Sequence, residues 1–90
     1  MTDKTIEERV KIVIGKELCY DTAFIHLDHK LGKDLQADSL DISVLELELE
    51  EEFSIFIESK DFYRSMRVED IVNLVTKIVN ETYITQQTTN

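Results

Sequence analysis

The chain has 90 residues, enough for one small domain, and its 19 acidic side chains outnumber 10 basic ones to give a net charge of −9. This charge argues against direct nucleic-acid binding, which needs a basic footprint, and disfavours anionic membrane surfaces. A hydrophobic content of 42% without Pro or Trp suits a small helical domain better than a disordered tail. Partners that present a basic patch are favoured.

Cys19 is the single cysteine, which excludes an internal disulfide and a cysteine-rich zinc site. We expect it to be a small packing residue at the end of the first helix. Residues 1–11 are charged and lack the apolar core of a signal peptide, and no run approaches membrane-spanning length. The expected protein is soluble and cytoplasmic.

The first predicted helix covers residues 5–18. Thr5 and Glu8 have the spacing of a capping box, and apolar residues then recur at helical spacing. Gly15 inside this helix costs about 1 kcal/mol relative to Ala. Residues 19–38 have no clean period, although a short helical turn is compatible with them. We expect five apolar side chains to hold this segment against the core: Phe24, Ile25, Leu27, Leu31 and Leu35.

Two histidines in the same segment raise the question of a metal site. His26 and His29 flank Asp28. No further ligand cluster has the spacing that a metal site needs. We therefore expect solvated loop histidines and no metal.

The second predicted helix covers residues 39–53, although residues 44–50 read VLELELE and alternate as a strand would. Over the longer window, the helical period gathers one narrow apolar arc, the core arc, made of Ile42, Leu45, Leu49 and Phe53. A second apolar group, the outer stripe, lies on the opposite side and consists of Leu40, Val44 and Leu47.

The outer stripe has an acidic surround. Glu51 lies within it, and Asp41 and Glu48 lie beside one edge. Scattered exposed aliphatic side chains are common on protein surfaces and explain such a stripe without any function. The alternative is a docking helix whose apolar face enters a partner's groove while the acidic groups steer it toward a basic surface.

The remainder of the chain predicts an extended segment, a short helix and a long helix. Residues 55–57 are expected to be extended, and a short helix near 59–65 should turn Phe62 and Met66 inward. The best helical pattern covers residues 68–83, and residues 84–90 are expected to form a frayed tail. The apolar stripe of the last helix consists of Val68, Ile71, Val72, Val75, Ile78, Val79 and Tyr83.

Ser39 lies between Asp38 and Asp41 at the start of the second helix. As a helix cap, either Ser39 or Asp38 could accept the first free backbone N–H groups. As a nucleophile, Ser39 lacks a G-x-S-x-G elbow and a well-placed base. As an attachment point, it has a helix N-terminus that favours a bound phosphate. The two flanking carboxylates oppose a phosphate, and would serve better as marks for a modifying enzyme or as metal-ion anchors during modification.

Residues 34–41 read DLQADSLD, which resembles the D-L-G-A-D-S-L-D signature of the acyl carrier proteins, and residues 50–53 read EEEF, as in that family. The resemblance covers roughly residues 6–80. It implies an all-α four-helix bundle, with three main helices and a short third one. It also implies that a phosphopantetheinyl transferase attaches 4′-phosphopantetheine from coenzyme A to Ser39. The thiol of that group would then hold acyl intermediates as thioesters.

The same resemblance implies a monomeric, non-catalytic carrier for fatty-acid, related lipid or polyketide biosynthesis. Its expected partners, besides the transferase, are acyl-transfer and condensing enzymes with basic patches. Together with the outer stripe, it implies a docking surface made of Asp38, Leu40, Asp41, Val44, Leu47, Glu48 and Glu51. The residues implied to shelter an acyl chain are Leu45, Leu49, Phe53, Ile57, Val68 and Ile71.

Five positions depart from the family pattern and leave the partner set open, among them Glu58, which replaces a frequent Pro, and Arg67, which replaces a frequent Thr. Gln36 stands where Gly is usual, Val44 stands where an acidic docking residue is common, and Glu46 stands where an apolar residue is common. The chain is therefore either a general fatty-acid carrier or a specialised one. The alternative function is an acidic adaptor that keeps the carrier fold, is not loaded and acts only by protein–protein interaction.

Overall fold

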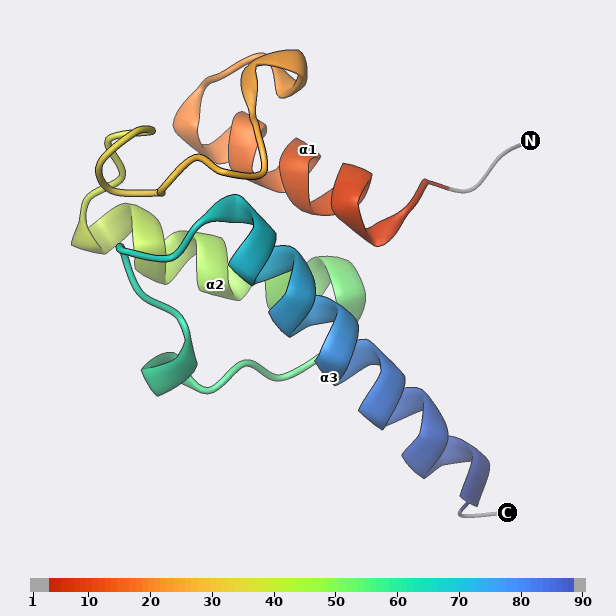
Figure 1. Cartoon of the computed structure of the whole chain (residues 1–90). Helices are drawn as coiled ribbons and strands as arrows, with labels where there is room; N and C mark the ends of the chain where they lie inside the picture. Colours follow the sequence, from red (N-terminus) through yellow and green to blue (C-terminus); the bar gives the residue numbers. More distant parts are fainter. Residues whose placement is uncertain (1–3, 89–90) are drawn as a thin grey trace.

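The structure is a computed structural model that describes the backbone of residues 4–88 and the side chains of residues 4–82. Three α-helices, α1 (Ile6–Leu18), α2 (Ser39–Phe53) and α3 (Val68–Thr88), surround a common core (Figure 1). Two 3-10 turns, η1 (Thr22–Phe24) and η2 (Ser59–Asp61), interrupt the long connections. The predicted all-α bundle is confirmed, with its short third helix reduced to the single turn η2.

Helix α1 begins with the predicted capping box. The Thr5 hydroxyl accepts a hydrogen bond from the Glu8 backbone N–H at 3.1 Å, and the Glu8 carboxylate accepts one from the Thr5 N–H at 2.9 Å. This backbone hydrogen bond, with a further one from the Thr5 hydroxyl, lowers the pKa of Glu8 below its usual value. The first helix therefore starts where the sequence predicts.

The end of α1 differs from the expectation for Cys19. Cys19 is exposed and adopts a left-handed conformation with φ of 64°, from which its N–H donates to the Gly15 carbonyl. It is a helix C-cap and not a packing residue. Gly15 is buried, and a Cβ atom added there would lie 2.7 Å from the Tyr20 carbonyl oxygen. The chain turns so tightly over Gly15 that only glycine fits.

The connection from α1 to α2 is held by buried aliphatic side chains, as predicted. Ile25, Leu31 and Leu35 are buried and Leu27 is half-buried. Phe24 is instead 50% exposed, so the prediction that it packs into the core is wrong.

Phe24 belongs to an aromatic cluster on the surface of this connection. Its ring stacks on Tyr20 with a centroid distance of 5.2 Å and contacts the His29 ring at 5.5 Å. The Tyr20 hydroxyl donates a hydrogen bond to the Leu35 carbonyl at 3.0 Å. Phe24 is therefore retained at the surface by aromatic neighbours instead of by the core.

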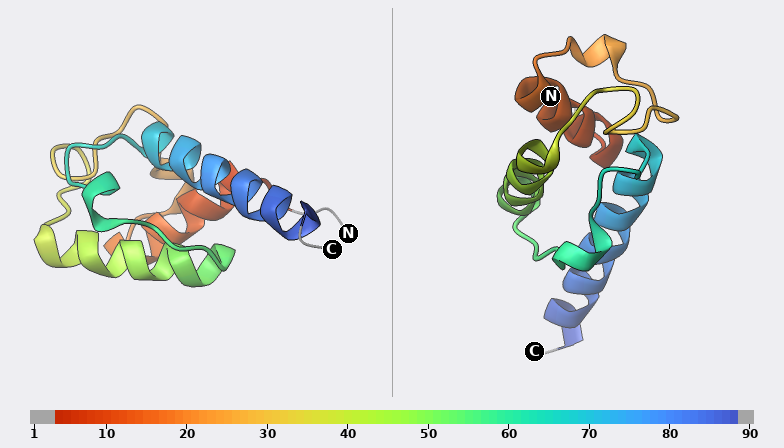
Figure 2. Two further views of the ribbon diagram at one scale, coloured as in Figure 1. Left: turned by 90° about the horizontal axis from the view of Figure 1, so that it is seen from below. Right: turned by 90° about the vertical axis from the view of Figure 1, so that its left-hand side faces the viewer.

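Helix α2 has the predicted bounds and the predicted inner face. Ile42, Leu45 and Leu49 are buried, which confirms helix over strand for the alternating sequence. Phe53, the last member of the core arc, is half-buried, and the Arg9 guanidinium lies 4.3 Å above its ring centre. Views from two further directions show α2 packed along α1, with α3 crossing the other side of the core (Figure 2).

The segment between α2 and α3 is fastened to α2 by two glutamates. The Glu50 carboxylate accepts a hydrogen bond from the Ile57 N–H at 2.7 Å, and the Glu46 carboxylate accepts one from the Ser59 hydroxyl at 3.0 Å. Phe62 and Met66 are buried, as predicted. The acidic residue at position 46 is thus accommodated at the edge of the core, where it binds η2.

Helix α3 packs its predicted stripe into the bundle. Val68, Ile71 and Val75 are buried, while Tyr83 lies outside the described side chains. The helix continues past the predicted end at residue 83 to Thr88, with helical backbone where a frayed tail was expected, and residues 89–90 of that tail lie outside the described residues. None of the helices within residues 4–88 combines the length and apolar character needed to cross a membrane.

Candidate functional site

The turn that leads into α2 is held by contacts from distant parts of the chain. Ala37 is fully buried, its N–H donates to the Leu31 carbonyl at 2.9 Å, and its carbonyl accepts a hydrogen bond from Arg64 Nε at 2.8 Å. Gln36 precedes it in a left-handed conformation with φ of 61°. These contacts fix the position of the backbone directly before Ser39.

The N-cap of α2 is Asp38 and not Ser39. The Asp38 carboxylate accepts a hydrogen bond from the Asp41 N–H at 2.8 Å, and the Asp41 carboxylate accepts one from the Asp38 N–H at 3.0 Å. The two acids beside the serine therefore form a reciprocal capping box. This resolves the choice that the sequence left open.

Ser39 is the first residue of α2 and is exposed. Its carbonyl accepts a hydrogen bond from the Ser43 hydroxyl at 3.3 Å, whereas no described residue hydrogen-bonds the Ser39 hydroxyl itself. The neighbouring Asp38 and Asp41 carboxylates are occupied by the backbone. The arrangement leaves one hydroxyl accessible at a helix N-terminus, with the surrounding main chain rigidly placed.

The two histidines form a pair of their own. His29 Nδ1 accepts a hydrogen bond from the His26 N–H at 3.1 Å, and the rings meet edge to face with centroids 4.9 Å apart. Within the described residues, no group of three or more His, Cys, Asp or Glu side chains is placed to hold a metal ion.

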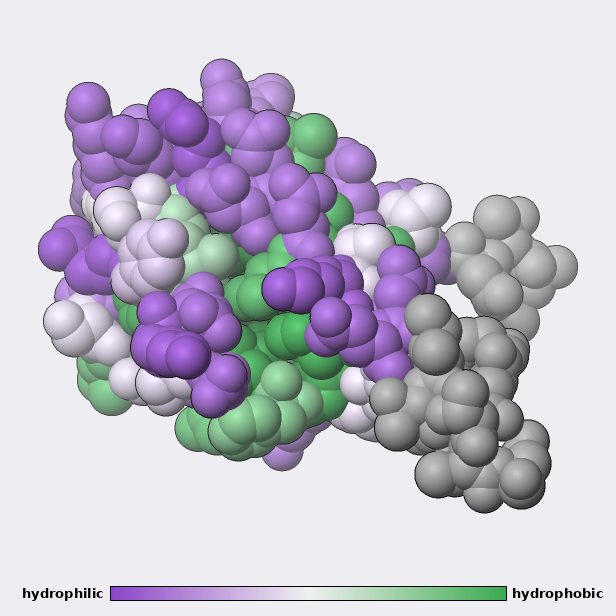
Figure 3. Space-filling view, turned by 60° about the horizontal axis from the view of Figure 1, so that its bottom comes forward, coloured by the Kyte–Doolittle hydropathy of each residue, from purple (hydrophilic) through white to green (hydrophobic). Residues whose placement is uncertain are grey.

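The outer stripe is exposed, as its pattern predicts. Leu40 is 72% exposed and Leu47 is 61% exposed, while Val44 between them is half-buried. Glu51 is exposed beside them. The space-filling view in Figure 3 shows one face of the molecule, on which hydrophobic side chains reach the surface between hydrophilic ones. The molecule thus presents apolar side chains within a strongly charged exterior.

Glu48 is half-buried and lies on the side of α2 that faces α1. Burial raises the pKa of the Glu48 carboxyl, and the charge of Glu17 and a hydrogen bond with it raise it further. Glu48 also lines a groove between the two helices, with Ile12, Val13, Lys16, Glu51 and Glu52. Sequence periodicity placed Glu48 on the rim of α2 but carried no information on its partner in α1.

The residues predicted to shelter an acyl chain meet in one cluster between α2, α3 and the segment that joins them. Five of them, Leu45, Leu49, Ile57, Val68 and Ile71, are buried, and Phe53 packs against the cluster at its half-buried edge. Their closeness was expected from the sequence. The hydrogen bond from Arg64 to Ala37 was not predicted, because a single arginine in a loop has no periodic or motif signal.

The curated relatives described below are all acyl carrier proteins, although no family model matches the chain. It is 35% identical over 69 residues to the acyl carrier protein of Campylobacter jejuni subsp. doylei, which covers 77% of this chain and 90% of the relative. It is 36% identical over 73 residues to that of Solidesulfovibrio magneticus, covering 81% of this chain and 94% of the relative.

A further relative gives the same result. The chain is 32% identical over 69 residues to the acyl carrier protein of Phaeodactylum tricornutum, covering 77% of this chain and 91% of the relative. Identity at this level across nearly the whole length of the relatives agrees with the three-helix fold and the DSLD turn. The chain belongs to the acyl carrier protein family.

Proposed function

We propose that this chain carries acyl groups as thioesters on 4′-phosphopantetheine attached to Ser39. The observation that carries the proposal is the exposed Ser39 hydroxyl at the first turn of α2, with its neighbouring carboxylates turned into the helix cap. A phosphodiester at this position would lie near the free N–H groups of the helix N-terminus, which favour an anion. The residues present therefore fit the group.

The attachment chemistry needs an external enzyme. Ser39 Oγ would attack the pantetheine-bearing phosphorus of the coenzyme A pyrophosphate, so that the new O–P bond forms as the P–O bond to adenosine 3′,5′-bisphosphate breaks. The serine proton would pass to a base that the transferase supplies, and adenosine 3′,5′-bisphosphate would leave. The chain offers no base of its own that hydrogen-bonds this hydroxyl among the described residues. The attached group supplies a terminal thiol that holds the acyl cargo.

The outer stripe and its acidic neighbours are the proposed docking surface. Asp38, Leu40 and Asp41 would be read by the transferase, and Val44, Leu47, Glu48 and Glu51 would meet acyl-transfer and condensing enzymes. Exposed leucines offer apolar contact, and the acidic net charge favours approach to a basic patch. We place this activity in fatty-acid or related lipid or polyketide biosynthesis, with the carrier acting as a cytoplasmic monomer that does not itself catalyse a reaction.

An acyl cargo would be sheltered by the buried cluster of Leu45, Leu49, Phe53, Ile57, Val68 and Ile71. Because these side chains already pack against one another, the cargo would have to part α2 from the 54–67 segment. The two glutamate contacts to Ile57 and Ser59 are the links that would resist this movement. Removing apolar cargo from water would stabilise the loaded carrier.

The proposal is tested on the chain purified from its natural host by intact mass, with and without neutral hydroxylamine. We expect a phosphopantetheine increment on Ser39, with a fraction that carries a further acyl mass that hydroxylamine removes, as a thioester requires. A chain that is wholly unmodified in the host would instead support the unloaded adaptor.

A further inference from the structure

Phe56, just beyond the end of α2, is 74% exposed, the largest exposed fraction among the large hydrophobic side chains that the structure describes. The backbone on both sides of it is fixed. The Ile55 N–H donates to the Glu50 carbonyl at 3.1 Å, and the Ile57 N–H donates to the Glu50 carboxylate at 2.7 Å. Ile57 turns inward and is buried, whereas Phe56 is directed outward. An aromatic ring is thus held at the surface by a well-anchored segment.

A groove lies between this segment and α3, and we refer to it as the α3 groove. Leu74 and Ile78 are one helical turn apart on the same side of α3, and both are half-buried. With Phe56 they supply the apolar part of the groove from two different elements. The segment and the second half of α3 lie in the lower part of Figure 1, and Figure 3 brings this side forward. Hydrophobic side chains gather there in a hollow between hydrophilic ones. The full lining consists of Phe56, Glu58, Asp61, Leu74, Lys77, Ile78 and Glu81.

Acidic side chains surround the apolar part of the α3 groove. Glu58, Asp61 and Glu81 are exposed carboxylates that approach it from both elements. Lys77 is the one cation among the described residues of the lining, and Lys60 on η2 lies outside it. None of the lining residues belongs to an ion pair within the described part of the chain. The carboxylates therefore outnumber the cation, and the groove favours a positively charged occupant.

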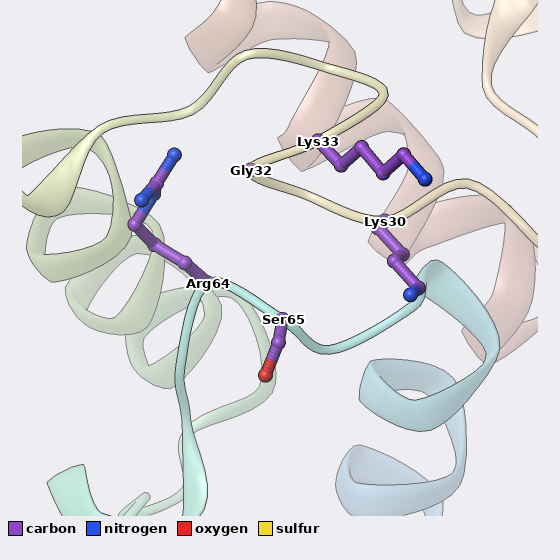
Figure 4. Close-up of a pocket in the computed structure, with 5 residues that line it drawn as sticks. All are labelled: Lys30, Gly32, Lys33, Arg64 and Ser65. Carbon is purple, nitrogen blue, oxygen red and sulfur yellow. The ribbon is translucent and has the colours of Figure 1, made fainter.

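The cations nearest to the turn before Ser39 lie outside the groove. Arg64 donates to the Ala37 carbonyl at 2.8 Å. Figure 4 shows the side chains of Lys30 and Lys33 extending away from that of Arg64. None of these three cations lines the α3 groove. Like charge disfavours the approach of a basic segment to these loops, whereas the carboxylates of the groove favour it.

The α3 groove is separate from the proposed docking surface on α2. Its described lining contains no residue of α2. Ser39 begins α2 and Phe56 follows its end, so about 20 Å of helix lie between them. An occupant of the groove would therefore leave Ser39 and the outer stripe accessible.

We propose that the α3 groove binds an amphipathic, basic segment of a partner protein. Apolar side chains of that segment cover Phe56 and lie against Leu74 and Ile78, which removes apolar surface from water. Its lysine or arginine side chains meet the surrounding carboxylates, which sets the direction of approach. A helix with one apolar face and a basic flank has the pattern that such a groove accepts. This binding goes beyond the proposed function and does not require a loaded Ser39.

The groove is tested with the full unmodified chain and a phage-displayed library of random peptides of about 14 residues, roughly four helical turns. Peptides that the wild type retains are counter-selected on Phe56→Ser, a change at an exposed side chain whose melting temperature shows that the fold is kept. We expect the enriched peptides to combine apolar residues at helical spacing with a net positive charge. Their binding should shift the amide NMR signals of residues 55–61 and 74–81.

Affinities of the enriched peptides then separate the contributions of the groove. Phe56→Ser should weaken binding by about tenfold or more, as the loss of a central aromatic contact does. Leu47→Ser removes an exposed hydrophobic side chain from the outer stripe and should leave the affinity unchanged. Glu81→Lys should weaken binding roughly two- to fivefold. Glu69→Lys changes the net charge equally, at an exposed position on the first turn of α3, and should have little effect.

A selection that yields no peptide with a preference for the wild type over Phe56→Ser would overturn the proposal. Enriched peptides without a basic bias, or equal effects of Glu81→Lys and Glu69→Lys, would contradict the role of the carboxylates. Binding that is lost with Leu47→Ser and shifts the signals of the outer stripe would place the segment on the other surface. Because the chain is unmodified at Ser39, none of these results bears on its loading.

Discussion

Gln36 holds a backbone conformation that favours glycine. Its φ of 61° lies in the left-handed region, where a side chain with a Cβ atom costs about 1–2 kcal/mol. Glycine is usual at this position in the acyl carrier family, which agrees with the geometry of the turn. The strain is tolerated because the backbone contacts of the adjacent Ala37 fix the chain on its C-terminal side.

We predict that Gln36→Gly stabilises the protein. The substitution relieves the strain but gives the unfolded chain more freedom, so the net gain should be about 0.5–1 kcal/mol. The melting temperature should rise by roughly 2–8 °C in a domain of this size. Gln36→Ala retains the strained Cβ and should give no rise. Equal melting temperatures for the two variants would show that the left-handed turn is not the source of strain.

We predict that Gly15→Ala destabilises the protein, although it replaces glycine inside a helix. Alanine is favoured over glycine inside a helix by about 1 kcal/mol, so helix propensity alone predicts that Gly15→Ala stabilises. A Cβ at this position would lie 2.7 Å from the Tyr20 carbonyl oxygen, a backbone atom that cannot turn aside. We therefore expect a net loss of about 1–3 kcal/mol, measured by urea unfolding. A gain in the free energy of unfolding would contradict the tight turn.

Single residues were predicted best where a local rule acts within one turn of helix. The Thr5–Glu8 capping box follows from spacing alone, and the structure confirms it. The cap of α2 stayed open because serine and aspartate are both good caps, and only the hydrogen bonds separate them. The prediction that Cys19 packs into the core was wrong. The hydrophobic pattern carries no mark of the residue that ends a helix in the left-handed conformation.

At the scale of elements, two like charges meet where α1 packs against α2. Burial, and then the charge of Glu17, raise the pKa of Glu48 above the usual value of a glutamate carboxyl. A raised pKa means that the folded state binds the proton more tightly than the unfolded state does. The associated stability is therefore present at acidic pH and is lost as pH rises through the pKa of the folded state.

Glu48→Gln is expected to stabilise the protein at neutral pH, where Glu48 is charged. The gain should be about 1–4 °C in melting temperature, since the repulsion at a partly exposed site amounts to a fraction of a kcal/mol. The gain should disappear at pH values well below 4.5, where the wild-type carboxyl is already protonated. Glu58→Gln removes an exposed charge beside η2 and should lack this pH dependence. The same gain at both pH values would contradict the interaction.

The helices were predicted more accurately than their connections. The bounds of α2 follow from the core arc, whose members Ile42, Leu45 and Leu49 are buried, although the outer stripe on the opposite side weakens the helical period. The pairing of loops 30–33 and 64–67 could not be predicted, since it depends on hydrogen bonds between residues such as Gly32 and Arg64 that lie far apart in the chain. The same holds for the contact of Glu48 with α1.

At the scale of the whole molecule, charge opposes folding. The net charge of −9 is spread over a small domain, and α2 alone carries acidic residues from Asp41 to Glu52. Compacting like charges costs free energy, and salt screens it over a Debye length that falls from about 30 Å at 0.01 M to about 10 Å at 0.1 M.

We predict that added salt or divalent cations raise the melting temperature. The rise should be visible between low and physiological ionic strength, because screening changes most there. A comparison of sodium chloride with the uncharged solute sucrose separates screening from general effects on solvent. A melting temperature that is independent of salt would show that self-repulsion is not a major cost.

The assignment of the chain to the acyl carrier protein family depends on a short motif at a predictable place in the order of helices. Helix order, acidic composition and the DSLD turn were all visible in the sequence, and identity to acyl carrier proteins across most of the chain agrees with them. We propose that the shape and charge of the docking surface determine which enzymes the carrier serves. Its half-buried Val44 and its α1-facing Glu48 become apparent only in three dimensions.

The central claim is that Ser39 is the loading site, and intact mass tests it most directly. The purified chain is incubated with coenzyme A and a broad-specificity phosphopantetheinyl transferase, beside Ser39→Ala and the exposed neighbour variant Ser43→Ala. We predict one added phosphopantetheine on the wild type and on Ser43→Ala, and none on Ser39→Ala. A folded wild-type chain that gains no mass, or a Ser39→Ala chain that still gains it, would contradict the claim.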